Sequence, residues 1–179
     1  MTQPARPLPL CPIDVLVESP LWNGIADIES CVRRAVAAAL PPERADCGLA
    51  VVLTDDQTMR GLNARFRGSD TATNVLSFPT PRSPGPPADQ SHGEPISLGD
   101  IVIAFETVRA EAVAEGKEFG HHVAHLLVHG VLHLLGYDHH SDPEAEAMEA
   151  RERAILMQLD MPDPYAERDR VPADGHGRA

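Results

Sequence analysis

Three histidines lie close together in one segment of the chain, and their spacing constrains the fold more than any other feature. The segment covers residues 129–139 and reads HGVLHLLGYDH. On a helix, His129 and His133 are four residues apart and share a face, so both imidazoles can reach one metal ion. A helix rises about 1.5 Å per residue, so a third ligand further along a straight helix lies too far away. The chain must therefore turn back after His133.

Gly136 is the residue at which we expect this turn. Glycine adopts the left-handed backbone conformation that often ends helices, and Gly136 follows the second histidine by three residues. His139 then returns toward the metal. Three imidazole ligands leave a fourth coordination position for water, which is typical of catalytic rather than structural zinc sites. The segment therefore predicts one zinc ion per chain, with His129, His133 and His139 as its ligands.

The same spacing matches the metzincin peptidase signature HExxHxxGxxH at every position except one. In that signature a glutamate follows the first histidine and acts as the general base. Here the corresponding residue is Gly130, which has no side chain. The segment thus keeps the metal ligands of a metallopeptidase and lacks its base, which disfavours peptidase activity.

Length and composition indicate a single globular domain. The 179 residues, of which 42% are hydrophobic, suit one sizeable core. We expect the domain to span residues 1–160 and a flexible C-terminal tail to span residues 161–179. No apolar run approaches the roughly 20 residues that a membrane span needs, and the N-terminus lacks the apolar stretch of a signal peptide. The sequence predicts a cytoplasmic protein without membrane contact, and it indicates no oligomeric state.

Charge is distributed unevenly along the chain. The net charge of −12 by itself disfavours a nucleic-acid partner. The acids crowd between Asp142 and Glu152 and in the tail, whereas Arg60, Arg65 and Arg67 cluster with few acids nearby. A local basic patch can therefore exist on this acidic protein, although Arg60 and Arg65 fit a solvated helix face better than a set of RNA contacts. The acidic run that ends at Glu152 is also expected to be a solvated helix face.

Hydrophobic periodicity predicts an α/β (α+β) domain with the element order βαβαββααα. Strands are expected at 13–17, 49–53, 75–78 and 101–105, and helices at 25–39, after Thr54, at 107–115, at 119–135 and from Ser141 onward. A proline-rich loop separates the third and fourth strands. The helix at 119–135 is apolar on most of its surface, so it should be buried at the centre, with the metal site at its end. This order indicates a small mixed sheet covered by helices.

The second helix carries specific side-chain expectations. Thr54 is expected to be its N-cap, because a threonine hydroxyl can accept a hydrogen bond from the first free backbone N–H groups. Met59, Leu62 and Phe66 recur at helical spacing and are expected to face inward.

Together with two further motifs, the histidine segment resembles the YbeY family of bacterial rRNA maturation factors. These motifs are NVLSFP at residues 74–79 and LGDI at residues 98–101. The resemblance runs from about residue 47 to residue 160. It implies a zinc-dependent endoribonuclease of single-stranded RNA, which acts in 3′-end maturation of 16S ribosomal RNA in the small subunit and in ribosome quality control.

The resemblance also implies roles for individual residues. His129, His133 and His139 match the zinc ligands of the family, and Arg67, in the segment FRGSD, matches its functionally important arginine. Zinc can lower the pKa of a bound water to ~7. A guanidinium near the reacting phosphorus offers two parallel donors to the charge that develops there. We therefore expect Arg67 to be catalytic, although a plain surface role for it stays open.

Three functional classes stay open at this point. The first is a zinc endoribonuclease, the second is a metzincin-like metallopeptidase, and the third is a non-catalytic ribosome-assembly factor whose zinc only stabilises the fold. His125 is expected to pack or to support a ligand rather than to bind the metal, and Asp138 to orient a ligand or to cap a turn. The remaining histidines near the motif are expected at the surface or at helix caps: His121, His122 and His140.

Overall fold

The computed structural model describes residues 12–44, 47–81 and 96–166. Most of the expected proline-rich loop and residues 167–179 of the expected tail lie outside these ranges. The strands are β1 (Ile13–Val17), β2 (Gly48–Thr54), β3 (Val75–Pro79) and β4 (Ser97–Ala104). The helices are α1 (Ile28–Ala39), α2 (Asp56–Arg67), α3 (Phe105–Ala114), α4 (Phe119–Leu134) and α5 (Asp142–Gln158), with short 3-10 helices η1 (Pro20–Gly24) and η2 (Pro42–Arg44). The predicted order βαβαββααα is confirmed.

The four strands form one mixed sheet in the order β1-β2-β4-β3. β1, β2 and β4 run parallel, and β3 runs antiparallel to β4. The α/β class with a small mixed sheet is therefore confirmed. β3 is an edge strand, so its outer side is not paired with another described strand.

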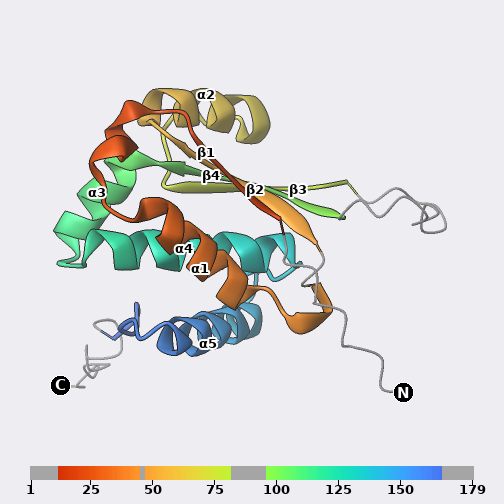
Figure 1. The fold of residues 1–179 in the computed structure, drawn as a ribbon. Helices are drawn as coiled ribbons and strands as arrows, with labels where there is room; N and C mark the ends of the chain where they lie inside the picture. The colour runs from red at the N-terminus through yellow and green to blue at the C-terminus, as the bar shows by residue number, and fades with distance from the viewer. Residues whose placement is uncertain (1–11, 45–46, 82–95, 167–179) are drawn as a thin grey trace, which may run out of the picture.

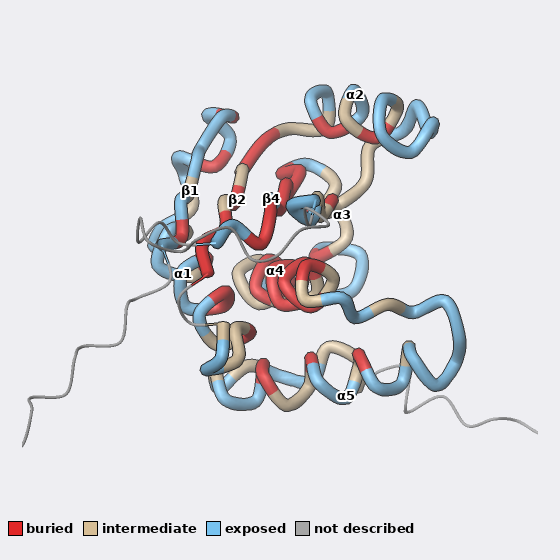
Figure 2. Tube along the Cα trace, turned by 90° about the vertical axis from the view of Figure 1, so that its right-hand side faces the viewer, coloured by how far each residue is buried: buried red, intermediate tan, exposed pale blue. Residues whose placement is uncertain are grey.

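Helices cover both faces of the sheet (Figure 1). α2 lies on one face, where Met59, Leu76, Val102 and Ala104 form a small core. α1 and α4 lie on the other face, and α5 packs on the far side of α4. Figure 2 shows α4 as the buried centre of this arrangement, as its apolar sequence predicted. None of the described helices has the length and apolar character that crossing a bilayer requires.

Two expectations for α2 were wrong. Its N-cap is Asp55, whose carboxylate accepts a hydrogen bond from the backbone N–H of Thr58 at 2.9 Å, whereas Thr54 is the last, fully buried residue of β2. Phe66 is 55% exposed rather than inward-facing. Phe66 lies in the last turn of α2, beyond the small core that contains Met59.

The chain just beyond α5 is packed against the domain. Tyr165 contacts the imidazole of His125 on α4, with ring centroids 5.4 Å apart. The guanidinium carbon of Arg153 on α5 lies 4.9 Å from the centroid of the Tyr165 ring. The flexible tail predicted for residues 161–179 is therefore wrong at Tyr165, and residues 167–179 lie outside the described ranges.

Candidate metal centre

The end of α4 brings two histidines face to face. His129 and His133 lie one turn apart, and their Nε2 atoms are 3.0 Å from each other. α4 then ends with the backbone hydrogen-bond pattern of a glycine-terminated helix: the N–H of Gly136 donates to the carbonyl of His133, and that of Tyr137 to the carbonyl of Leu132. Gly136 has a φ of 96°, which a residue with a side chain rarely adopts. The predicted turn at Gly136 is confirmed.

The turn at Gly136 brings His139 back beside His129 and His133. The His139 ring centroid lies 5.7 Å from that of His129 and 5.1 Å from that of His133. One ligand atom from each of the three residues lies within 4.8 Å of the others. The three histidines identified by their spacing therefore form a group that could hold a metal ion.

In His129 and His133, the Nδ1 atom already has a hydrogen-bond partner. His129 Nδ1 lies 2.8 Å from a carboxylate oxygen of Glu152, and His133 Nδ1 lies 3.1 Å from the backbone carbonyl of Tyr137. When each Nδ1–H donates to these acceptors, each Nε2 carries a free lone pair. Two lone pairs that face each other at 3.0 Å repel unless a cation lies between them. The donor set thus fits a metal ion that imidazoles prefer.

His133 is held in the form that can bind a metal. Burial lowers the pKa of His133, and the neighbouring His129 and His139 lower it further. The neutral imidazole, which is the ligand form, is therefore favoured at neutral pH.

Glu152 of α5 is the functional residue that the sequence interpretation missed. Its side chain is only 1% exposed, so the expected solvated face of the acidic run was wrong at this position. It accepts hydrogen bonds from His129 at 2.8 Å, from His125 at 3.0 Å, and from the hydroxyl of Tyr165. Burial alone would raise the pKa of Glu152, but these three donors outweigh it and lower the pKa to about 2. A carboxylate so placed fixes the orientation of His129.

A signal for Glu152 was present in the sequence. Met148, Glu152 and Ile155 recur at helical spacing, and all three are buried on the face of α5 that meets α4. A carboxylate inside an apolar stripe must find hydrogen-bond donors or a counter-charge. The position of Glu152 in that stripe, rather than its residue type, distinguishes it from the exposed acids around it.

The structure tests the predictions made for three other polar residues near the motif. His125 contacts Glu152 rather than the three histidines, which is the supporting position predicted for it. His122 is only 5% exposed, with its Nε2 atom 2.9 Å from Glu111, so the surface expectation was wrong there. Asp138 binds the backbone N–H of His139 at 2.8 Å, which makes it a turn residue.

Gly130, the residue after the first histidine, is closely packed against its neighbours. A Cβ atom there would lie 3.1 Å from two carbons of Ile101 and 3.1 Å from Ser77 Oγ. The Ser77 hydroxyl also donates to the Gly130 carbonyl at 3.3 Å. Close packing of α4 against β3 and β4 therefore accounts for the absence of the peptidase glutamate at this position.

Arg67 lies apart from the histidine group. It is the exposed last residue of α2, and α2 and α4 cover opposite faces of the sheet (Figure 1). Among the described residues, no hydrogen bond or ion pair joins Arg67 to the three histidines. Its catalytic role stays a prediction.

The fold and the site together define a class: a small α/β domain in which a buried helix and the turn after it gather three imidazoles able to hold a metal ion. The chain belongs to the endoribonuclease YbeY family, whose sequence profile matches residues 22–160. The resemblance based on HGVLHLLGYDH and NVLSFP is thereby confirmed.

Relatives of similar length carry the same family description. An endoribonuclease YbeY of Rhodopseudomonas palustris is 52% identical over 174 residues, which cover 96% of this chain and 87% of that protein. One of a Bradyrhizobium species is 48% identical over 171 residues, covering 94% of this chain and 99% of the relative. A solution structure of a Thermotoga maritima protein shares 22% identity, with a TM-score of 0.48 and coverage of 91% of this chain and 99% of that one.

Proposed function

We propose that this chain is a zinc-dependent endoribonuclease that cleaves single-stranded RNA. The observation that carries the proposal is the convergence of His129, His133 and His139 in a chain that belongs to the endoribonuclease YbeY family. An RNA substrate follows from the family. The metal identity and the single-stranded substrate are the further steps that experiments must test.

Zinc is the metal that suits this donor set best. Three histidine ligands with a remaining coordination position are the arrangement of a catalytic zinc site. When bound, zinc supplies Lewis-acid chemistry, because it polarises a phosphoryl oxygen and makes water more acidic. We propose one zinc ion per chain, held by the three imidazole groups.

The residues of the chain prepare the site for that chemistry. His129 is oriented through its Nδ1 atom by Glu152, and His133 by the Tyr137 carbonyl. Both Nε2 lone pairs are thereby directed inward before any metal arrives. Because Gly130 carries no side chain, the position directly after the first ligand supplies no carboxylate base. The chemistry must then depend on the metal and on the RNA itself, rather than on a protein base at that position.

Arg67 is the candidate for stabilising charge at the phosphorus. Displacement at a phosphodiester builds negative charge on the phosphoryl oxygens, and a guanidinium can donate two parallel hydrogen bonds to them. The support for this role is the match of FRGSD to the family motif and the exposed position of Arg67 at the end of α2.

Removal of Arg67 gives a direct test of its role. Arg67→Ala should keep its zinc and its melting temperature but cleave ~10²–10³ times more slowly under single turnover, as expected for loss of one charge-stabilising donor. Arg67→Lys should recover only part of the rate, because lysine lacks the paired donors. A wild-type single-turnover rate in Arg67→Ala would assign the residue to binding or packing instead.

We propose that the cellular substrate is the precursor of 16S ribosomal RNA in the small ribosomal subunit. The enzyme then acts in the cytoplasm, in 3′-end maturation and in ribosome quality control. The support is family membership. Cells depleted of this protein should accumulate small-subunit RNA with unprocessed 3′ ends, which primer-independent end mapping can measure. Correct 3′ ends in depleted cells would contradict this role.

A metallopeptidase is disfavoured by a specific contact. The Cβ of a glutamate at position 130 would lie 3.1 Å from side-chain atoms of Ile101 and Ser77, so the peptidase base would fit only if those side chains shifted. Wild-type protein should therefore leave unstructured peptides intact. Zinc-dependent cleavage of such peptides would contradict the nuclease assignment.

One sample can test the metal and the activity together. Protein purified without added metal should contain zinc at one ion per chain by elemental analysis. After depletion it should lose cleavage of single-stranded RNA, and zinc should restore it. A non-catalytic assembly factor would instead bind the ribosomal subunit and show no metal-dependent cleavage in either state.

A further inference from the structure

Two aromatic side chains form an exposed contact between α2 and β3. Phe66, in the last turn of α2, is 55% exposed. Its ring meets the ring of Phe78 in an edge-on arrangement, with the centroids 5.0 Å apart and the planes at 63°. Phe78 is only partly buried against the small core beneath α2. Exposed aromatic faces are uncommon away from binding surfaces, because burying such a ring is favourable.

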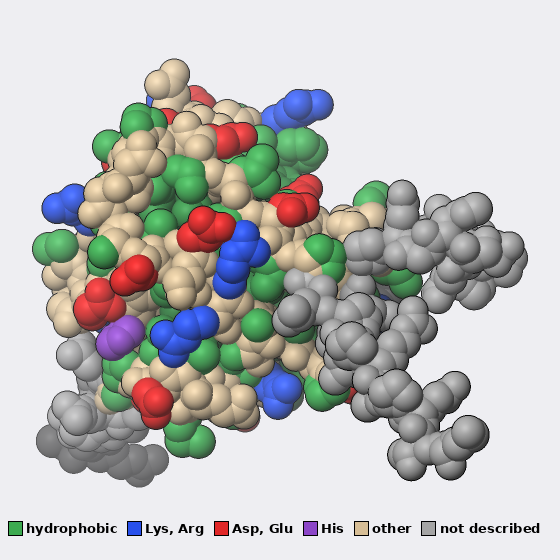
Figure 3. Space-filling model, in the orientation of Figure 1, with side chains coloured by type: hydrophobic (Ala, Val, Ile, Leu, Met, Phe, Trp, Pro, Cys, Tyr) green, Lys and Arg blue, Asp and Glu red, His purple; other side chains and the backbone are tan. Residues whose placement is uncertain are grey.

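The residues that flank Phe66 are cationic. The guanidinium carbon of Arg65 lies 5.1 Å from the centre of the Phe66 ring, and Arg67 is the next residue along the chain. Arg60 is neutralised by Asp70 through two hydrogen bonds of 2.7 Å. In the described part of the chain, no ion pair involves Arg65 or Arg67. Figure 3 shows basic side chains beside hydrophobic ones at the upper right, near α2.

β3 connects this surface to the metal centre. Successive residues of a strand point to opposite faces. Phe78 faces α2, whereas Ser77 faces α4 and donates to the carbonyl of Gly130, the neighbour of His129. In Figure 2, α2 and the segment between α4 and α5, which carries His139, extend toward the same side of the molecule, and β1 and α1 extend toward the other. The two faces of β3 thus contact the two surfaces.

We propose that Phe66 and Phe78 stack unpaired bases of an RNA strand that crosses the free edge of β3 on its way to the metal centre. Arg65 then contacts an adjoining phosphate. This inference rests on the proposed endoribonuclease function and adds where the substrate is held. Aromatic rings bind any base through its π face, so such a surface is sequence-tolerant but requires single-stranded RNA. It also lets a protein with a net charge of −12 bind a polyanion locally.

The test separates stacking from general apolarity. Phe66→Leu keeps an apolar side chain and removes the ring, whereas Phe66→Trp keeps a ring. The probe is a fluorescent single-stranded 2′-O-methyl oligoribonucleotide, followed by anisotropy and checked to be intact afterwards. Phe66→Leu should weaken binding about tenfold, within the range for loss of one base–aromatic stack, and Phe66→Trp should bind like the wild type. Phe78→Leu should weaken binding in the same direction.

The matched control lies on the opposite edge of the sheet. Leu16 of β1 is 46% exposed, so Leu16→Ala also trims an exposed apolar side chain and should leave binding unchanged. Wild-type affinity in Phe66→Leu would overturn this surface, as would equal weakening in Phe66→Trp or in Leu16→Ala. If the wild-type protein fails to cleave single-stranded RNA at all, the proposed function falls as well. Cleavage by the wild type with unchanged binding in Phe66→Leu refutes the surface alone.

Discussion

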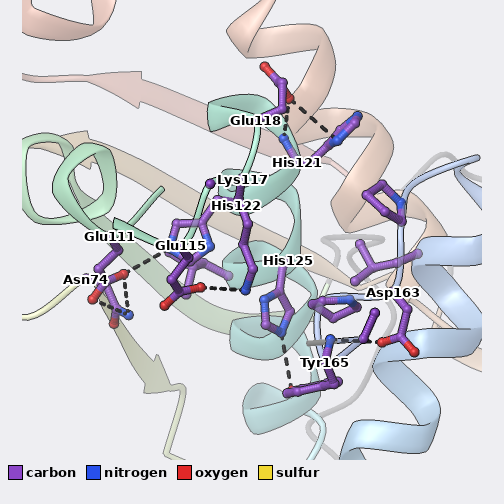
Figure 4. A pocket seen from close by; sticks show the side chains of 16 residues that line it. Asn74, Glu111, Glu115, Lys117, Glu118, His121, His122, His125, Asp163 and Tyr165 are labelled. Carbon is purple, nitrogen blue, oxygen red and sulfur yellow. Dashed lines mark hydrogen bonds and ion pairs between the residues drawn. The ribbon is translucent and has the colours of Figure 1, made fainter. Parts of the chain in front are cut away.

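The two halves of α4 carry histidines in different ways. In the N-terminal half, His122 and His125 meet carboxylates through Nε2: His122 meets Glu111 at 2.9 Å, and His125 meets Glu152 at 3.0 Å. Figure 4 shows both imidazoles in the wall of a cavity of about 790 Å³, with His122 beside Glu111 and His125 beside Tyr165. In the C-terminal half, His129 meets Glu152 through Nδ1 instead, and His133 meets a backbone carbonyl through Nδ1.

The nitrogen that a neighbour occupies decides what each histidine can do. When a carboxylate takes Nε2, the atom at the tip of the ring is no longer available to a metal. When the acceptor instead binds Nδ1–H, the Nε2 lone pair remains available to a metal ion. The same carboxylate, that of Glu152, shows both arrangements with residues one turn apart. The cavity lies beside the half of α4 in which the Nε2 atoms of His122 and His125 meet carboxylates.

The largest expected effect separates the two halves by metal content. His133→Ala should abolish zinc binding, because two ligands alone hold the ion weakly, whereas His121→Ala at the other end of α4 should bind zinc normally. Elemental analysis after gel filtration measures both. If His133→Ala kept full zinc while His125→Ala lost it, the assignment of ligands between the two halves would be reversed.

A smaller effect is expected when the shared carboxylate is changed. Glu152→Gln should weaken zinc binding by about 10- to 100-fold, the usual result of removing a group that orients a ligand histidine. Competition with a chromogenic chelator measures the affinity without reference to activity. Glu146→Gln, an exposed acid on the same helix, is the matched control. Equal affinities in the two variants would show that Glu152 does not orient His129.

Metal removal should affect stability only moderately. The ion joins the C-terminal half of α4 to the following turn, whereas the N-terminal half is held by its own hydrogen bonds and by the main core. Zinc at a hundred times its Kd stabilises a fold by about 2.7 kcal/mol, or roughly 5–10 °C for a domain of this size. Chelated protein should still melt cooperatively by circular dichroism, and a non-cooperative transition would mean that the whole fold depends on the metal.

The smallest expected effect concerns Tyr165, which contacts both halves through His125 and Glu152. Tyr165→Phe removes one hydrogen bond to a buried carboxylate and should lower the free energy of unfolding by about 1.5 kcal/mol. Urea denaturation measures it. Tyr137→Phe serves as the control, because no hydrogen bond of the Tyr137 hydroxyl is found within the described residues. A similar loss in both variants would place the effect of Tyr165 outside its contact with Glu152.

The convergence of the three histidines could be predicted from the sequence because local geometry determines it. The spacing of His129 and His133 on a helix, and a glycine at 136 to reverse the chain, involve no partner distant in sequence. Glu152 lies 23 residues from His129, and its role depends on how α5 packs on α4, which periodicity does not specify. The acidic composition around it favoured a solvated face.

The boundary between two elements is hard to predict where no turn separates them. The run from Leu98 to Val108 is apolar with few interruptions, so the junction of β4 and α3 at Ala104 and Phe105 lies one to two residues from the predicted one. Phe66 has the spacing of an inward residue, yet it lies past the end of the small core. Neither the length of that core nor the position of α2 opposite α4 can be obtained from a one-dimensional pattern.

The position of His139 has a kinetic consequence. His129 and His133 belong to one helix and would offer two preorganised ligands to a metal ion, whereas His139 is exposed on the segment after Gly136. Dissociation of the ion can then proceed stepwise, with the His139 arm detaching first and the helical pair releasing last. Opening of that short segment should therefore set the rate of metal exchange. The site could then bind the ion tightly at equilibrium and still let it enter and leave quickly.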